Sequence, residues 1–209
     1  MKTNRTFWLI VAVCIAPVVA SYFLYYGVRP EGRVNYGELL EPQVSLSEMP
    51  LAAQHRPKTE SGFVDFLKAL PSNDPRQGLA RMSDMRGRWL LVRVGPAQCD
   101  QLCKDQLWAM RQIRIATGRE RDRVERLWIV TDPSNPSLDS DWMKNYEGTW
   151  VMRASNEMTK NWPSQGSSPA AHIWLVDPLG NLMMRFPLEP DPAKMKSDLM
   201  RLLKASRIG

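Results

Sequence analysis

The chain has 209 residues, of which 44% are hydrophobic, and its 28 lysines and arginines against 22 acidic residues give a net charge of +6. This length suits one sizeable domain plus an appendage, and the apolar content argues against wholesale disorder. Basic residues crowd between Arg114 and Arg126, but acidic residues interleave with them and no aromatic side chain accompanies them, so we expect no nucleic-acid partner.

The N-terminus reads as a membrane anchor. An uncharged, mostly apolar run over residues 6–26 follows Lys2 and Arg5. A membrane-spanning helix needs roughly 20 apolar residues, and aromatic residues stand at both ends of this run, as at membrane interfaces. We expect residues 1–27 to be an anchor that lies in the lipid bilayer through residues 6–26. A cleaved signal peptide is the alternative, but the apolar run continues past the small residues that resemble a cleavage site.

The charges before the run predict the orientation of the chain. Basic residues favour a cytoplasmic N-terminus, so we expect a single-pass protein of the inner membrane with its C-terminal domain in the periplasm. Exported thiols tend to be oxidised unless they are kept reduced or bind metal. Cys14 lies inside the apolar run, and the preceding Val13 is not the small residue that a lipobox requires. We interpret Cys14 as an inert side chain in the membrane.

Residues 28–81 are rich in proline, glycine and charge and show no sustained period. We expect a tether and an irregular arm that packs on the following domain. Within this arm residues 62–70 could form a short helix, and His55 is expected to face solvent. From residue 82 the pattern becomes regular, which predicts a domain over residues 82–209.

The elements of this domain follow from apolar patterning. Short apolar runs predict strands over residues 88–94, 126–132, 149–154, 172–177 and 182–186, the last two forming a hairpin. Helical spacing predicts helices over residues 99–118, 137–146 and 191–205, the last with Asp191 as its N-cap. Strands joined by helices imply parallel pairing, and the hairpin adds an antiparallel pair. The predicted fold class is α/β: a three-layer, thioredoxin-like domain with a mixed central sheet, after one N-terminal transmembrane helix.

Two cysteines, Cys99 and Cys103, lie where the first strand of the domain turns into a helix. Residues four apart share a helix face, so both sulfurs would point the same way. The helix N-terminus favours a thiolate, which makes Cys99 the expected more reactive sulfur. A disulfide between them is geometrically possible, but it closes a tiny loop and stabilises little. The pair therefore suits reversible chemistry, and we predict a redox-active couple.

His172 is a candidate third ligand. In a thioredoxin-like fold the loop before the strand over residues 172–177 faces the helix that carries the cysteines. His172 could then complete a Cys2His set with Cys99 and Cys103, and soft thiolates with one imidazole suit copper. A zinc site would want a fourth ligand. The alternative is a strand-edge histidine that only caps or packs.

Three motifs in this order resemble the SCO/SenC family, the thioredoxin-like copper proteins of cytochrome c oxidase assembly. "GRWLLVRVGPAQCDQLC" resembles the family's first strand and CxxxC loop, with Gly95 ahead of the first cysteine. "LWIVTDP" resembles its second strand, which ends in an Asp-Pro pair, here Asp132 and Pro133. "IWLVDPLGN" resembles its hairpin. The resemblance covers about residues 84–204.

The chain departs from the family at two positions. Asp100 stands where the family has a proline after the first cysteine. Pro169 stands where the family has its copper histidine, and His172 lies three residues later. The chain is therefore similar to a divergent member.

The resemblance implies a membrane-anchored, periplasm-facing protein that assists cytochrome c oxidase assembly, through copper delivery or thiol–disulfide chemistry. It implies Cys99, Cys103 and His172 as copper ligands. The implied partner is the copper-bearing oxidase subunit or another copper chaperone. Two alternatives stay open: a general periplasmic thiol–disulfide oxidoreductase, and a non-catalytic thioredoxin-like interaction module. The first is motivated by the cysteines at the helix start, and the second by the displaced histidine.

Overall fold

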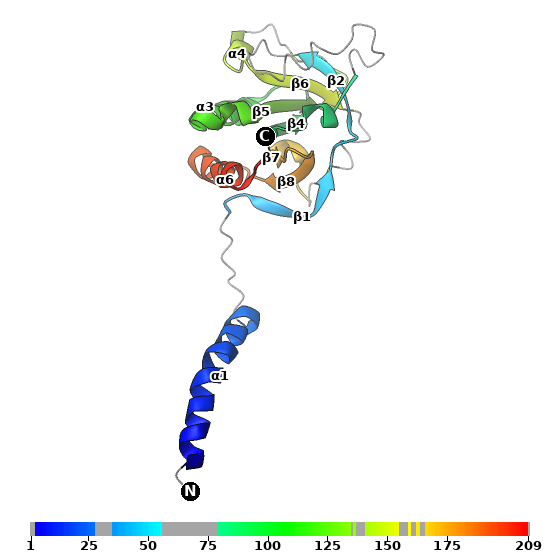
Figure 1. Cartoon of the computed structure of the whole chain (residues 1–209). Coiled ribbons are helices and arrows are strands. Elements are labelled where there is room, and N and C mark those ends of the chain that lie inside the picture. The colour runs from blue at the N-terminus through cyan, green and yellow to red at the C-terminus, as the bar shows by residue number, and fades with distance from the viewer. Residues whose placement is uncertain are drawn as a thin grey trace. The chain divides into compact units, whose positions relative to one another are not determined.

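The computed structural model describes residues 3–27, 35–55, 79–134, 136, 141–154, 159, 162–163 and 166–208. The chain forms two compact units, Met1–Val34 and Asn35–Gly209, which are coloured along the chain in Figure 1.

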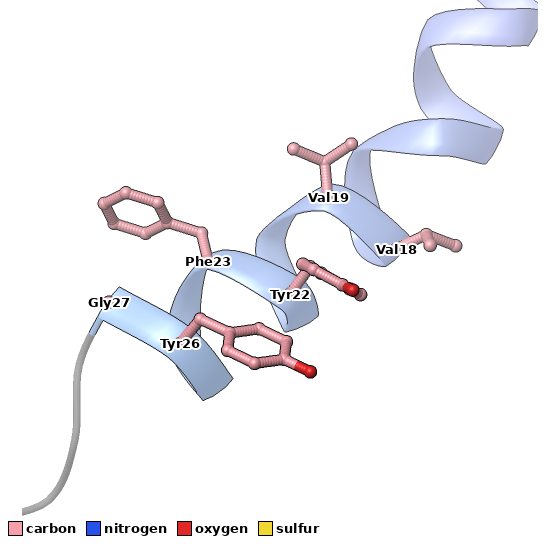
Figure 2. A pocket seen from close by; sticks show the side chains of 6 residues that line it. All are labelled: Val18, Val19, Tyr22, Phe23, Tyr26 and Gly27. Atoms are coloured by element: carbon pink, nitrogen blue, oxygen red, sulfur yellow. The ribbon is translucent and has the colours of Figure 1, made fainter.

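The first unit contains helix α1, Thr3–Gly27, which has 25 residues. At about 1.5 Å per residue it is longer than the roughly 30 Å of a bilayer's hydrocarbon core. By length and composition its segment Asn4–Gly27 could cross a membrane, as we expected from the sequence. Figure 2 shows the far end of α1, where Tyr22 and Tyr26 project to the same side, their ring centroids 4.7 Å apart. Tyrosines at this position suit a membrane interface.

The second unit is built on one eight-stranded sheet with the order β1-β8-β7-β4-β5-β6-β2-β3. The strands are β1 Glu38–Ser45, β2 Pro50–His55, β3 Leu79–Arg81, β4 Trp89–Gly95, β5 Val124–Val130, β6 Thr149–Ala154, β7 Ile173–Val176 and β8 Asn181–Arg185. Strands β4, β5 and β6 pair in parallel, whereas every other neighbouring pair is antiparallel. The mixed sheet that the sequence predicted is confirmed.

Within the part of the chain that the structure describes, three helices lie on one face of the sheet. They are α3 Gln101–Ala116, α4 Asp141–Lys144 and α6 Pro192–Ala205, and α3 lies beside α6 (Figure 1). The predicted N-cap of α6 is confirmed, because the Asp191 carboxylate accepts the Ala193 N–H at 2.8 Å. Of the predicted helix over residues 137–146, residues 141–144 are helical, and residues 137–140 lie outside the described residues.

Burial on both faces of β4 shows that this strand is central. Leu90 and Val92 pack with Trp150 and Trp174 in one cluster, while Leu91 packs against α3 and α6 on the other face. The first cluster is closed by the 3-10 helices and loops of the chain's earlier part, including Leu46, Met49, Met82 and Met85. Strand alternation therefore separates two cores, one under the helices and one under this covering segment.

The segment expected to be an irregular arm contributes three strands. β1 extends one edge of the sheet by pairing with β8, and β2 and β3 extend the other edge beyond β6. Its start is fixed by buried contacts, since the Gly37 N–H donates to Asp198 at 2.8 Å and the Tyr36 hydroxyl accepts the Asp191 N–H at 2.9 Å. The compact unit that contains these strands begins at Asn35.

Two further expectations concern this segment. His55 is not in an irregular stretch, because it ends β2, where its backbone lies opposite Val151 of β6. The possible helix over residues 62–70 lies outside the described residues.

Candidate functional site

The loop that carries Cys99 is fixed to the end of the neighbouring strand. Gly95 ends β4, and its carbonyl accepts the N–H of Thr131 at 3.1 Å. The Asp132 carboxylate accepts the Ala97 N–H at 3.1 Å. These two bonds tie the start of the loop, ahead of Cys99, to the segment after β5. The aspartate of the "LWIVTDP" motif therefore positions the cysteine loop.

Asp100 begins the helix between the two cysteines. It is the N-cap of α3, and its side chain accepts the Cys103 N–H at 2.8 Å. Cys99 therefore lies one residue before the N-cap and outside the helix. We expected the two cysteines to share a helix face, and they do not. The bend at the helix start brings their Cα atoms to 5.2 Å, and the two sulfurs form a disulfide. That separation lies well inside the range that disulfides adopt.

The two sulfurs differ in access. Cys103 is 0% exposed and packs with Leu107, Trp128 and Met143 under α3 and α4. Cys99 is half-buried at the edge of the same cluster. An attacking thiolate can therefore approach Cys99 and not Cys103, which makes Cys103 the leaving sulfur when the disulfide opens.

Arg93 is a buried charge in this cluster that sequence reasoning missed. It is 2% exposed in the middle of β4, and its guanidinium lies over the Trp128 ring, 5.4 Å from the centroid. Burial lowers the pKa of Arg93 to about 10, against the opposing attraction of Asp100. The guanidinium stays protonated at neutral pH. A single charged residue inside the apolar run "WLLVRVG" is the signal that could have revealed it.

Gly95 makes room for this guanidinium. A Cβ added at Gly95 would lie 2.7 Å from Nη1 and 2.9 Å from Nη2 of Arg93, closer than real side chains approach. The glycine that precedes the CxxxC pair therefore has a packing role in this chain, because its missing side chain leaves the space that the buried arginine fills.

His172 is held away from the cysteine pair. Its Nδ1 lies 2.7 Å from the Phe186 carbonyl oxygen, and its Nε2 lies 2.8 Å from Ser167 Oγ. A carbonyl only accepts, so Nδ1 donates to the Phe186 oxygen. The ring also packs edge-on to Trp174, 5.7 Å between centroids, and Trp174 belongs to the cluster on the other face of the sheet from Cys103.

The structure therefore brings Cys99 and Cys103 together but not His172. Among the described residues, no three histidine, cysteine or acidic side chains lie close enough to hold a metal. In this disulfide state the donor set that would hold copper is not assembled, and a ligand role for His172 stays a prediction. Cys14 lies in α1, in the other unit.

Solved structures of Sco proteins share this fold. Yeast Sco1 with copper bound is 12% identical over 84% of this chain and 96% of that chain, with a TM-score of 0.53. ScoI of Bradyrhizobium japonicum with copper bound is 16% identical over 76% and 99%, with a TM-score of 0.52. Apo Sco1 of Thermus thermophilus is 16% identical over 84% and 98%, with a TM-score of 0.51. At these identities the likeness shows a common fold, and the low identity fits a divergent relative.

Among curated proteins, no sequence is significantly similar to this chain. Residues 89–206, more than half of the chain, match the family model described as the transmembrane-like, thioredoxin-like, C-terminal domain. That segment runs from β4 through the disulfide and the hairpin to the end of α6. The chain therefore belongs to the family of transmembrane-like proteins with a thioredoxin-like C-terminal domain.

Proposed function

We propose that this protein is a membrane-anchored thiol–disulfide reductant, with its domain in the periplasm, that assists cytochrome c oxidase assembly. Its substrate would be the cysteines of the oxidase's copper-bearing subunit, which bind copper only when reduced. One observation supports the proposal most strongly: a disulfide at the start of α3 joins a half-buried Cys99 to a fully buried Cys103. That asymmetry suits an exchanging pair, in which one sulfur meets the partner and the other resolves the intermediate.

The reaction would run in two exchanges. The reduced Cys99 thiolate attacks one sulfur of the partner's disulfide, forming a mixed disulfide and releasing one partner thiolate. Cys103 then attacks Sγ of Cys99, which releases the second partner thiolate and forms the Cys99–Cys103 disulfide. Two electrons pass to the partner. A dithiol donor then reduces the pair again.

Copper handling is the second candidate, with the ion as cargo. Two of the structurally similar Sco proteins were solved with copper bound, and two reduced cysteines are soft ligands for Cu(I). His172 would join them only after leaving Ser167 and Phe186. Anaerobic Cu(I) titration of the reduced full chain tests this. Binding no tighter than that of a Cys99→Ser, Cys103→Ser variant would exclude it.

A cellular experiment tests the first proposal. The Cys99→Ser, Cys103→Ser double variant replaces the full chain, and thiol alkylation reports the redox state of the copper-bearing subunit. We expect those thiols to be oxidised and oxidase activity to be low, whereas the matched Cys14→Ser variant behaves as the unaltered chain. Full oxidase activity in the double variant would instead favour an interaction module. If the double variant lost disulfide turnover on unrelated substrates while oxidase activity stayed normal, the result would favour a general oxidoreductase.

A further inference from the structure

Arg93 places a buried positive charge in the middle of β4. β4 lies between β5 and β7, and every other residue of the strand is apolar. Nε and Nη1 of Arg93 are buried and have no hydrogen-bond partner among the described residues. A guanidinium in this state is costly, because burial removes the water that would bind its N–H groups. An anion beside it would offset that cost.

The guanidinium contacts the cluster that contains the buried sulfur, through the Trp128 ring. It reaches along β4 to Gly95, where the loop to Cys99 begins. It stacks on Trp128, which packs in one cluster with Cys103. Its charge also interacts with Asp100, whose carboxylate accepts the Cys103 N–H. These neighbours place the guanidinium close to the start of α3.

Opening the disulfide creates a negative charge in this cluster. When a dithiol donor reduces the pair, its thiolate attacks Sγ of Cys99, the S–S bond breaks, and the electron pair leaves on Sγ of Cys103. The donor's second thiolate then displaces Cys99, and the donor becomes a disulfide. Two electrons have moved to the pair. Because Cys103 is fully buried, water does not stabilise the thiolate that forms on its Sγ.

We infer that Arg93 is a positioning residue for the cysteine pair. Its buried guanidinium stabilises the Cys103 thiolate that forms when the disulfide opens, and so raises the reduction potential of the disulfide. In the oxidised state the exposed Asp100 attracts the guanidinium, but Nε and Nη1 have no hydrogen-bond partner among the described residues, and reduction adds a second negative charge at Cys103. Both effects shift the equilibrium toward the dithiol. The inference rests on the proposed redox function, since it concerns how readily the pair accepts electrons.

The test is the reduction potential of the full chain in detergent, equilibrated with dithiothreitol or glutathione buffers and read by alkylation and mass. Arg93→Met removes the charge and keeps an apolar chain of similar length. We expect the ratio of reduced to oxidised pair to fall at least tenfold at a fixed buffer, which for two electrons is about 30 mV. Arg93→Lys keeps the charge and should retain most of the potential.

Arg126 supplies the matched control. It is also buried, at 4% exposed, on the neighbouring strand β5, and burial likewise lowers its pKa to about 10. Its guanidinium donates to the Glu147 carbonyl, and its charge interacts with Arg114 and Glu125 but not with Asp100. Arg126→Met should therefore leave the potential of the pair unchanged. An equal fall in both methionine variants would overturn the inference.

A second variant keeps the inference falsifiable if Arg93→Met does not fold. Gly95→Ala retains the arginine but forces the guanidinium from its position, because the new Cβ would collide with Nη1. We expect a lower potential here too. A folded Arg93→Met or Gly95→Ala protein with an unaltered potential would overturn the role of Arg93. Normal oxidase maturation alongside that result would leave the proposed function standing.

Discussion

Asp100 couples the stability of α3 to the chemistry of the cysteine pair, and two substitutions separate these effects. Its carboxylate caps the helix by accepting the Cys103 N–H at 2.8 Å. Asp100→Ala removes both the cap and the charge. Asp100→Asn removes the charge but keeps a good capping side chain, because asparagine is as effective as aspartate at this position.

The cap sets the size of the stability effect. Replacing an N-cap aspartate by alanine costs about 1 kcal/mol. The compact unit Asn35–Gly209 has 209 − 34 = 175 residues, and in a domain of that size 1 kcal/mol lowers Tm by about 2–4 °C. We therefore expect Asp100→Ala to lower Tm by about 2–4 °C, and Asp100→Asn to change it by less than about 1 °C.

The charge sets the redox effect. A carboxylate beside a released sulfur disfavours reduction, so both variants should raise the reduction potential. Asp100 is exposed, and exposed charges are screened by water and salt. The rise should be smaller than the Arg93→Met fall, below about 30 mV, and should shrink as salt is added.

Two measurements on the oxidised and equilibrated full chain check this reasoning: calorimetry gives Tm, and alkylation in redox buffers gives the potential. The two variants should differ in Tm and agree in potential. An alanine variant as stable as the unaltered chain would refute the capping argument. A potential that falls in both variants would refute the assigned sign of the charge effect.

The remaining predictions concern the loop, the sulfurs and the histidine. Asp132→Ala removes the acceptor of the Ala97 N–H and should cost about 1 kcal/mol in chemical denaturation, with faster reduction of the loosened loop. In Cys103→Ser the accessible Cys99 should accumulate mixed disulfides at the pair on non-reducing gels, whereas Cys99→Ser, in which the remaining sulfur of the pair is buried, should not; both variants are made in a Cys14→Ser background, because Cys14 is a free thiol. His172→Ala should cost about 1–3 kcal/mol, because the buried Phe186 carbonyl loses its donor and the half-buried Ser167 loses its ring partner. It should leave the reduction potential unchanged; a shifted potential would show that the ring does reach the sulfurs.

Local patterning predicted the part of the fold that depends on neighbouring residues. The apolar run of β4 and the capped start of α6 each carry their own signal. The turn between β7 and β8 does as well, since the Asp177 carboxylate accepts the Leu179 and Asn181 N–H groups and Gly180 has a φ of +90°. These features need no long-range partner to be recognised.

The edge strands lacked such a signal. β1 exposes most of its side chains and contains a proline, so its sequence shows no apolar alternation. Its strand structure comes from pairing with β8, far along the chain. For the same reason, the sequence carried no local signal that β1 belongs to the compact unit beginning at Asn35.

The candidate site was predicted in part for a related reason. The CxxxC pair is local and was found. The face on which His172 lies depends on β7 pairing with β4 in one register, which places Trp174 and the histidine ring together on the other side. The charge of Arg93 inside an apolar strand could have been noticed in the sequence, but its contact with the Trp128 ring on the next strand depends on strand pairing that the sequence does not show.

The reduction potential of Cys99–Cys103 in the unaltered full chain tests the central claim most directly. Structural disulfides in exported proteins have potentials below about −300 mV, whereas exchanging pairs lie between about −120 and −270 mV. We predict a value in the second range. A value below about −300 mV would identify the bond as a structural cross-link and contradict the redox function.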